Sequence, residues 1–200
     1  MTLEIKDCYK KYNDKLVFEN ISYKFENKIY WLKGSNGIGK SVLLRCLTNI
    51  EKFTGGTIQS DKKNILYIPE FSLNEDWLTL RENVKLLMYY HKLHIDDEKL
   101  SNILYKLNMG DCNILPTKAS LGTNIKTSLA LLFVEKYWDL IIIDEALAHI
   151  DNSTKSNIIR ELARRCDENA TVILTHHGEF MNEKNKLDMK EIFLDKGGLR

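Results

Sequence analysis

Cysteine and proline are scarce in this chain of 200 residues, which contains four of the first and two of the second. Cys8, Cys46, Cys112 and Cys166 are scattered, with no CxxC pair and no Cys/His cluster at zinc spacing. Small disulfide-stapled domains and zinc modules are therefore excluded, and a reduced, cytoplasmic protein is favoured. The chain also has no internal repeat and no Pro/Ser-rich linker, which favours a single domain.

Long apolar runs and a charge imbalance are missing as well. The longest apolar runs, 129–134 and 140–143, are too short to span a bilayer, and the first residues lack the apolar core of a signal peptide. The 29 basic and 28 acidic residues give a net charge of +1, so no overall field attracts the chain to nucleic acid. We therefore expect no nucleic-acid partner and no membrane-spanning segment of its own.

The order of the hydrophobic patterns predicts an α/β fold. Apolar positions alternate within the first thirty residues, which predicts short half-buried strands. The continuous apolar segments 29–32, 140–143 and 171–174 predict strands that are buried on both faces. Because parallel sheets covered by helices have such strands, we expect a mostly parallel sheet with an N-terminal antiparallel β region.

Helical patterns lie between these strands. Apolar residues fall on one helical face in three sets: Val42, Leu43, Cys46, Leu47 and Ile50; Ile125, Leu129, Leu132 and Phe133; and Ile158, Ile159, Leu162 and Cys166. Two further helices are predicted at 80–93 and 97–107, with no strand around them. We therefore expect segment 72–118 to be a small helical subdomain, and segments 1–71 and 119–200 to form the core.

A glycine-rich loop follows the predicted strand 29–32. Residues 34–41, Gly-Ser-Asn-Gly-Ile-Gly-Lys-Ser, satisfy the P-loop pattern G-x-x-x-x-G-K-[ST] between a strand and a helix. Such glycines let backbone N–H groups turn inward around phosphates, Lys40 can reach the β and γ phosphates, and Ser41 can bind Mg²⁺. The predicted nucleotide-binding residues are Ser35, Asn36, Gly37, Ile38, Gly39, Lys40, Ser41 and Val42. A glycine-rich turn without a ligand is the alternative, and the flanking strand and helix disfavour it.

Two acidic residues end the predicted strand 140–143. A buried strand of this kind presents carboxylates at the ligand edge of the sheet. We predict that Asp144 holds Mg²⁺ and that Glu145 orients the attacking water. An isolated motif of this type is more often a strand followed by an acidic loop, but its pairing with the loop 34–41 predicts a P-loop NTPase.

With further motifs in the same order, the chain resembles the nucleotide-binding domains of ABC ATPases over nearly its whole length. Residues 54–58 are similar to the segment after the P-loop helix, 65–70 to the strand before the glutamine loop, and 144–151 to the Walker B motif and D-loop. The resemblance implies ATP and Mg²⁺ as cofactors. It also implies that Tyr12 stacks on adenine and that His176 contacts the γ-phosphate.

Two positions depart from the family pattern. Glu70 stands where the family has glutamine, near the metal and the membrane partner, so we expect a charged oxygen in the metal shell. The signature, usually Leu-Ser-Gly-Gly-Gln, is Ala-Ser-Leu-Gly-Thr at 119–123, which retains Ser120 and Gly122 but replaces a glycine by Leu121. A leucine restricts the close approach to ATP that glycine allows.

The resemblance implies a dimer in which the signature and the D-loop Asp151 of one chain complete the ATP site of the other. Because the signature is altered here, we expect a heterodimer with a second ABC subunit of fuller signature, or else a slow homodimer. ATP-driven closure would then move a separate integral membrane transporter subunit, from a peripheral position on the inner face of the cell membrane. The compact chain favours an exporter.

The sequence also contains features of two alternative protein classes. A GTPase is suggested by Asn-Lys-Leu-Asp at 185–188 and by a DxxG match at 195–198, but a GTPase needs these motifs in the reverse order. The other alternative is a non-transport ABC ATPase, a regulatory or remodelling module that acts on DNA or ribosomes. Such proteins usually carry long coiled coils or two ABC domains in one chain, and neither is present in this sequence.

Overall fold

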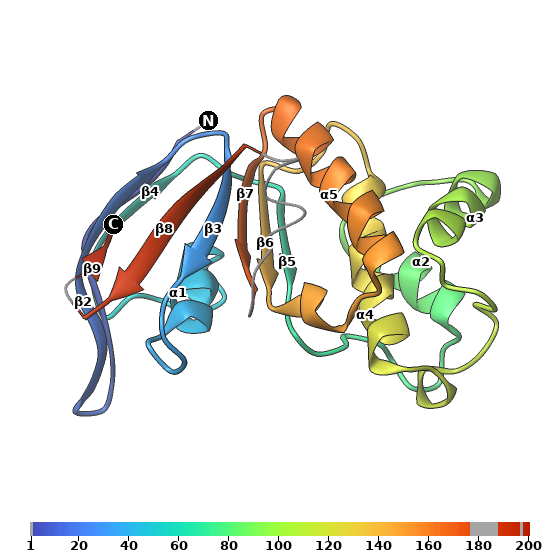
Figure 1. Ribbon diagram of the computed structural model, residues 1–200, viewed down its shortest axis with the longest axis horizontal. Coiled ribbons are helices and arrows are strands. Elements are labelled where there is room, and N and C mark those ends of the chain that lie inside the picture. The colour runs from blue at the N-terminus through green and yellow to red at the C-terminus, as the bar shows by residue number, and fades with distance from the viewer. Residues whose placement is uncertain (1, 177–187, 197) are drawn as a thin grey trace.

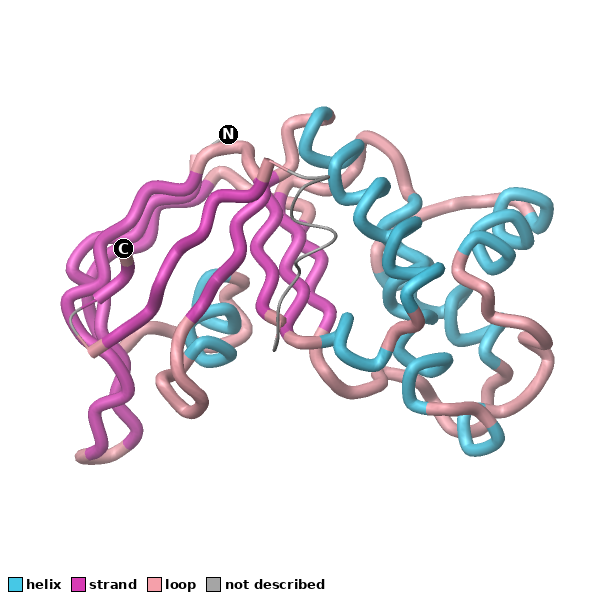
Figure 2. The backbone as a smooth tube through the Cα atoms, viewed as in Figure 1, coloured by secondary structure: helices cyan, strands magenta, loops and turns pink. Residues whose placement is uncertain are grey.

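The described residues form two β-sheets (Figures 1 and 2). The computed structural model describes residues 2–176, 188–196 and 198–200. An antiparallel sheet has the strand order β2-β1-β4, with bounds β1 Leu3–Tyr12, β2 Lys15–Phe25 and β4 Gly55–Ser60. The second sheet has the order β5-β6-β7-β3-β8-β9, with bounds β3 Ile29–Lys33, β5 Ile65–Ile68, β6 Leu140–Asp144, β7 Thr171–Thr175, β8 Met189–Asp195 and β9 Gly198–Leu199. Its strands are parallel except for the β8–β9 pair, so the predicted fold class is confirmed.

The helices pack on both faces of the parallel sheet. Their bounds are α1 Lys40–Leu47, α2 Leu80–Tyr90, α3 Asp97–Lys106, α4 Leu121–Leu129 and α5 Asn152–Asp167, with 3₁₀ helices at Pro116–Lys118, Ala130–Phe133 and Ala146–His149. In Figure 1, α1 lies on the side of the antiparallel sheet, and α2 to α5 lie on the opposite side. Side chains cap several N-termini, as Thr79 does in a capping box with Glu82 at the start of α2.

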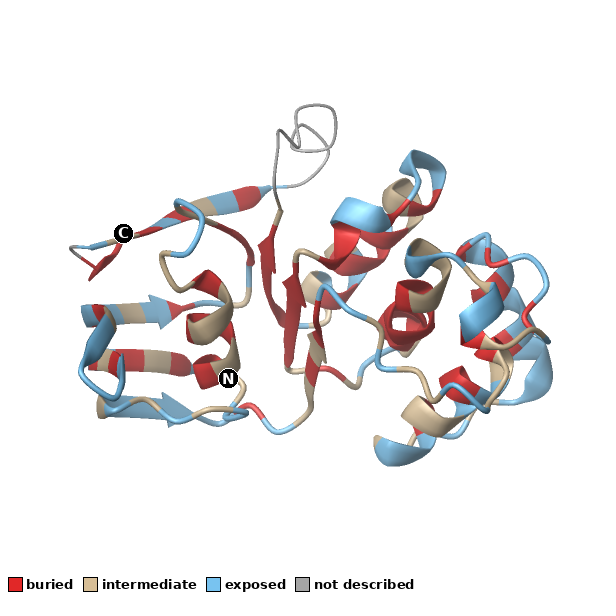
Figure 3. Ribbon diagram, turned by 90° about the horizontal axis from the view of Figure 1, so that it is seen from below, coloured by how far each residue is buried: buried red, intermediate tan, exposed pale blue. Residues whose placement is uncertain are grey.

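Each central strand contributes to two hydrophobic cores, because alternate side chains point to opposite faces of the sheet. Leu140 and Ile142 pack with α1 and the antiparallel sheet. Ile141 and Ile143 pack with α5 and with the helices α2 to α4. Both faces of the sheet are therefore buried, as Figure 3 shows by the red of its central strands.

The helix predicted to include Ile50 ends earlier than expected. Helix α1 ends at Leu47, and Asn49 then takes a left-handed conformation with φ 60°. Asparagine tolerates this conformation, which turns the chain out of the helix. Ile50 consequently lies beyond the helix and is 57% exposed, so its placement on the apolar helical face was wrong. The predicted helix through Phe133 is likewise divided, because α4 gives way to a 3₁₀ helix after Leu129.

The segment 72–118 contains α2 and α3 and no strand. Its buried residues, including Leu80, Val84 and Leu104, pack against the same core as α5. None of the described helices is both long and apolar enough to cross a membrane. Residues 185–187 of the Asn-Lys-Leu-Asp match and residue 197 of the DxxG match lie outside the described residues.

Candidate functional site

The loop between β3 and α1 is packed closely against its neighbours. Gly39 has φ 107°, and a Cβ atom there would lie 2.6 Å from the Val17 side chain. A Cβ atom on Gly34 would lie 2.6 Å from the carbonyl oxygen of Leu194 in β8. Only glycine fits at these two positions, because any Cβ atom would overlap β2 or β8. The loop is therefore fixed in place at both of its ends.

Lys40, the first residue of α1, folds back over this loop. Its Nζ donates hydrogen bonds to the carbonyl oxygens of Gly34 at 2.9 Å and Ser35 at 3.3 Å. Lys40 is only 9% exposed, because the loop surrounds its side chain. A cation held inside a glycine loop at a helix N-terminus is suited to bind a phosphate group.

Asp144, at the end of β6, accepts hydrogen bonds from three hydroxyl groups. Ser41 and Thr175 donate to Oδ1 at 3.1 and 2.9 Å. Tyr67 donates to Oδ2 at 3.1 Å. The three donors come from α1, β7 and β5, so the sheet order brings the start of α1 and the acidic end of β6 together. Burial and the neighbouring Asp144 charge raise the pKa of Tyr67 to about 12, so this hydroxyl stays protonated and donates.

The Ser41–Asp144 pair fits a magnesium ion. Carboxylate and hydroxyl oxygens are the hard ligands that Mg²⁺ prefers, and it commonly takes its remaining ligands from phosphates and water. Within the part of the chain that the structure describes, no group of three or more His, Cys, Asp or Glu side chains is arranged to hold a metal. An ion at Ser41 and Asp144 would therefore depend on a bound phosphate for some of its ligands.

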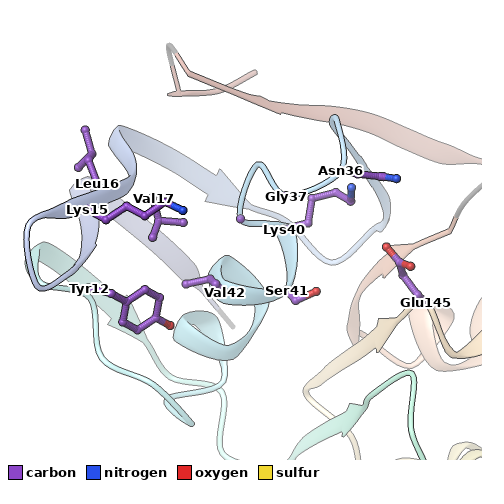
Figure 4. A pocket seen from close by; sticks show the side chains of 11 residues that line it. Tyr12, Lys15, Leu16, Val17, Asn36, Gly37, Lys40, Ser41, Val42 and Glu145 are labelled. Atoms are coloured by element: carbon purple, nitrogen blue, oxygen red, sulfur yellow. The ribbon is translucent and has the colours of Figure 1, made fainter.

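Glu145 follows Asp144 in a left-handed conformation, with φ 57° and ψ 1°. Its backbone N–H donates to Thr175 Oγ1 at 3.0 Å, which helps to hold this unusual backbone. The turn directs the Glu145 side chain toward Lys40 and Ser41 across the cavity (Figure 4). An acidic side chain is thereby placed opposite the glycine-rich loop 34–41.

A cavity of about 410 Å³ lies in front of this loop, and we call it the P-loop cavity. Its lining residues are Tyr12, Lys15, Leu16, Val17, Asn36, Gly37, Gly39, Lys40, Ser41, Val42 and Glu145. Figure 4 shows them coming from three places: the β1–β2 hairpin, the loop with α1, and the end of β6.

Most of the predicted nucleotide-binding residues line the P-loop cavity, but not all of them do. Ser35 and Ile38 border a different hollow beside β8. Conversely, sequence reasoning missed Lys15, Leu16 and Val17. Their position three to five residues after Tyr12, in a predicted β region, was a usable signal, because a hairpin that places one residue at a site brings its neighbours there too.

Glu70 and His176 lie at strand ends near the site but are not among the lining residues. The Glu70 carboxylate is exposed and lies 3.9 Å from Nε2 of His149, in the predicted D-loop. His176 directly follows β7 and is partly buried. The structure therefore does not bring Glu70 into the hydroxyl cluster around Asp144.

The predicted signature and D-loop pack against each other within the chain. Ser120 caps α4 by accepting a hydrogen bond from the Thr123 N–H at 3.1 Å. A Cβ atom on Gly122 would lie only 2.2 Å from the carbonyl oxygen of His149. Leu121, between these two residues, is 47% exposed. The glycine retained at 122 thus has a packing role in its own chain.

Asp151 caps α5 and joins it to α4. Its carboxylate accepts from the backbone N–H of Thr154 at 2.9 Å and lies 2.7 Å from the Lys126 Nζ. Burial would raise the pKa of Asp151, but the hydrogen bonds from Lys126, Ser153 and Thr154 outweigh it and hold this pKa below its usual range. The carboxylate stays charged at neutral pH, so the link between α4 and α5 persists.

The comparisons with known proteins decide the family. A family model described as ABC transporter matches residues 18–148, which is more than half of the chain. The chain belongs to the ABC transporter family. This ABC protein is 26% identical over 198 residues to the cytochrome c biogenesis ATP-binding export protein CcmA of Vibrio cholerae, covering 92% of the chain and 95% of the relative. It is 30% identical over 192 residues to the zinc import ATP-binding protein ZnuC of Rickettsia conorii, covering 92% and 79%.

Solved structures agree with this ABC assignment at the level of the fold. A dimeric ATP-binding cassette in a post-hydrolysis state, bound to ADP and phosphate, superposes with a TM-score of 0.82 at 18% identity, covering 99% of this chain and 96% of that one. An ATP-binding subunit of an ABC transporter superposes with a TM-score of 0.84 at 19% identity, covering 100% and 88%. The resemblance inferred from the sequence motifs is therefore confirmed.

Proposed function

We propose that this ABC protein binds ATP with Mg²⁺ in the P-loop cavity, hydrolyses it, and drives a separate membrane subunit. The observation that carries the proposal is the Ser41–Asp144 hydrogen bond, which joins the phosphate-type loop to the acidic strand end. Both halves of an NTPase site then face one cavity. The names of the relatives, which include the words ATP-binding, support the same nucleotide.

In this proposal the loop and α1 hold the triphosphate. The backbone N–H groups of residues 35–42 bind phosphate oxygens, and Lys40 exchanges its carbonyl contacts for the β and γ phosphates. Ser41 and Asp144 hold Mg²⁺, which supplies charge neutralisation on the phosphate oxygens when bound. The base stacks on Tyr12 at the far end of the cavity.

The catalytic step needs a positioned water. Glu145 faces Lys40 and Ser41, so its carboxylate orients the water and accepts a proton from it as the terminal phosphate bond breaks. His176, which follows β7 next to Asp144 in the sheet, contacts the γ-phosphate. Glu70, in the loop after β5, contacts the hydration shell of the Mg²⁺ ion.

In this proposal two ABC subunits form a dimer, and each subunit completes the ATP site of the other. The segment 120–122 of one subunit, which is exposed at Ser120 and Leu121, lies on the ATP of the other, and Asp151 borders the same interface. Since Leu121 carries an exposed side chain where the family has glycine, the site completed by this chain is the weaker one. A heterodimer with a second ABC subunit follows, with a slow homodimer as the alternative.

A membrane subunit docks next to Glu70. Phe71, Leu73 and Trp77 are exposed apolar side chains in the segment that follows β5, and Trp77 is 74% exposed. Clustered exposed apolar groups mark interaction surfaces. Segment 72–118 acts as the helical subdomain that transmits the motion, and the protein lies at the inner face of the membrane. Export remains the predicted direction; the relatives bear the words export and import, so they favour neither.

ATP binding and turnover by purified variants test the enzymatic part. Lys40→Ala should lose ATP binding or turnover, because it removes the cation from the loop. Glu145→Gln should keep ATP binding and lose hydrolysis, because the amide cannot accept the proton. A Glu145→Gln variant that hydrolyses ATP at the wild-type rate, or a wild-type protein that prefers GTP, would contradict the proposal.

Co-purification from mild detergent tests the membrane partner. Trp77→Ala should reduce recovery of an integral membrane protein with this chain, whereas Tyr105→Ala serves as the control. Tyr105 is 83% exposed on α3, at a distance in sequence from the loop after β5. Equal recovery with both variants would argue against docking at 71–77.

A further inference from the structure

The hydroxyl of Tyr12 is held by a cluster of charged side chains that the sequence did not suggest. It donates a hydrogen bond to Oε2 of Glu51, just after α1. The same carboxylate accepts from Arg45 Nε at 2.6 Å and lies 3.1 Å from Lys10 Nζ. Glu51 therefore connects the end of β1 with α1 through three partners. We call Glu51, Arg45 and Lys10 the Tyr12 clamp.

Lys10 also covers one face of the aromatic ring. Its Nζ lies 4.8 Å from the Tyr12 ring centroid, within cation–π range. The ammonium is itself fixed, since it donates to the carbonyl oxygen of Lys52 at 2.7 Å and its side chain is only 10% exposed. Tyr12 borders the P-loop cavity and Lys10 does not. The ring thus presents to the cavity a side that the ammonium leaves uncovered.

The charge states required for this arrangement hold at neutral pH. The hydrogen bond from Tyr12, together with those from Arg45 and Lys10, outweighs burial and holds the pKa of the Glu51 carboxyl at about 2. The hydrogen bond to Glu51 also raises the pKa of the Tyr12 hydroxyl. The carboxylate therefore remains an acceptor, and the hydroxyl remains a donor.

We propose that Glu51, supported by Arg45 and Lys10, is a positioning residue that fixes Tyr12 as a one-sided platform for the base of the bound nucleotide. The inference rests on the proposed function, since it needs a nucleotide in the P-loop cavity. Although Tyr12 is 44% exposed, the hydrogen bond from its hydroxyl to Glu51 restrains the ring. Ordering a mobile side chain on binding weakens affinity by roughly two- to tenfold, and a pre-ordered ring avoids that loss.

The experiment compares two ligands that share the phosphates but differ in the base: ATP and inorganic tripolyphosphate. Their affinities are measured by calorimetry for the wild type, Glu51→Gln and Tyr12→Phe. Tyr12→Phe keeps the ring and leaves the contacts of Glu51 with Arg45 and Lys10 in place, so it tests the hydroxyl without disturbing α1. Glu26→Gln is the matched control, because Glu26 is an exposed acid that also forms an ion pair, with Lys28 at 2.7 Å.

We expect Glu51→Gln and Tyr12→Phe to weaken ATP binding by about two- to tenfold and to leave tripolyphosphate binding unchanged. The variant that carries both Glu51→Gln and Tyr12→Phe should have the same ATP affinity as the single variant that binds ATP less tightly, because both changes break the same contact. In turnover assays Glu51→Gln should raise the KM for ATP by a larger factor than it changes kcat. Glu26→Gln should match the wild type with both ligands.

Two results would overturn the clamp while leaving the proposed function intact. One is wild-type ATP affinity in both Glu51→Gln and Tyr12→Phe. The other is an equal loss of ATP and tripolyphosphate affinity, which would show a general effect on the loop. A wild-type protein that binds neither ligand would instead overturn the proposed function, and the clamp with it.

Discussion

Replacing Gly122 by alanine sets two physical effects against each other. In a helix, alanine is favoured over glycine by about 1 kcal/mol, so helix propensity alone predicts a more stable protein. In this structure, however, the new Cβ atom would lie 2.2 Å from the carbonyl oxygen of His149, a backbone atom that cannot rotate away. Helix α4 would have to move outward by most of an ångström, and overpacking of this kind costs roughly 1–3 kcal/mol.

We therefore expect Gly122→Ala to lower the free energy of unfolding by about 1–2 kcal/mol and Tm by about 3–6 °C. Urea and thermal unfolding, followed by circular dichroism, measure both quantities. Leu121→Ala is the control, because that neighbouring side chain is half exposed in the same helix and should change stability little. A Gly122→Ala protein as stable as the wild type, or more stable, would refute the close packing of α4 on the segment Ala146–His149.

Three more predictions use the same unfolding assays. Lys126→Met should destabilise the protein by about 1 kcal/mol, because it removes the contact with Asp151, which is half exposed and so limits the loss. Tyr67→Phe should cost about 1–2 kcal/mol, since Asp144 loses one of its three hydroxyl donors. The pKa of Glu51 is depressed, so its contribution is present above about pH 4.5 and is lost as the pH falls toward 2. Glu51→Gln should thus lie about 1–2 kcal/mol below the wild type at neutral pH and converge with it in acid.

Local patterns in the sequence were enough to predict much of the fold. The loop at 34–41 and the strand 140–143 each stand out by spacing alone, because a strand, a turn and a helix need only neighbouring residues. The helix end at Leu47 was missed because the hydrophobic spacing continues to Ile50, past the turn of the backbone at Asn49. Side-chain periodicity records a helical face, but it does not record where the backbone leaves the helix.

The contacts within the candidate site were harder to predict. The hydroxyls of Tyr67 and Thr175 reach Asp144 because β5, β6 and β7 are neighbours in the sheet, and strand order is not written in any local pattern. The contact of Glu51 with Tyr12 was equally hard to predict, since the two residues lie 39 positions apart in the chain. In each case the residue looks ordinary in sequence, and only its long-range partner gives it a role.

The alternation of strand β6 between two cores separates the effects of adjacent residues. Ile142 supports the layer beneath α1 and the phosphate loop, whereas Ile141, one position earlier, supports the helices on the other face. Variation at neighbouring codons can therefore loosen opposite faces of the sheet, one packed against α1 and the other packed against α2 to α5. In β6, a single peptide bond separates a residue that supports one core from a residue that supports the other.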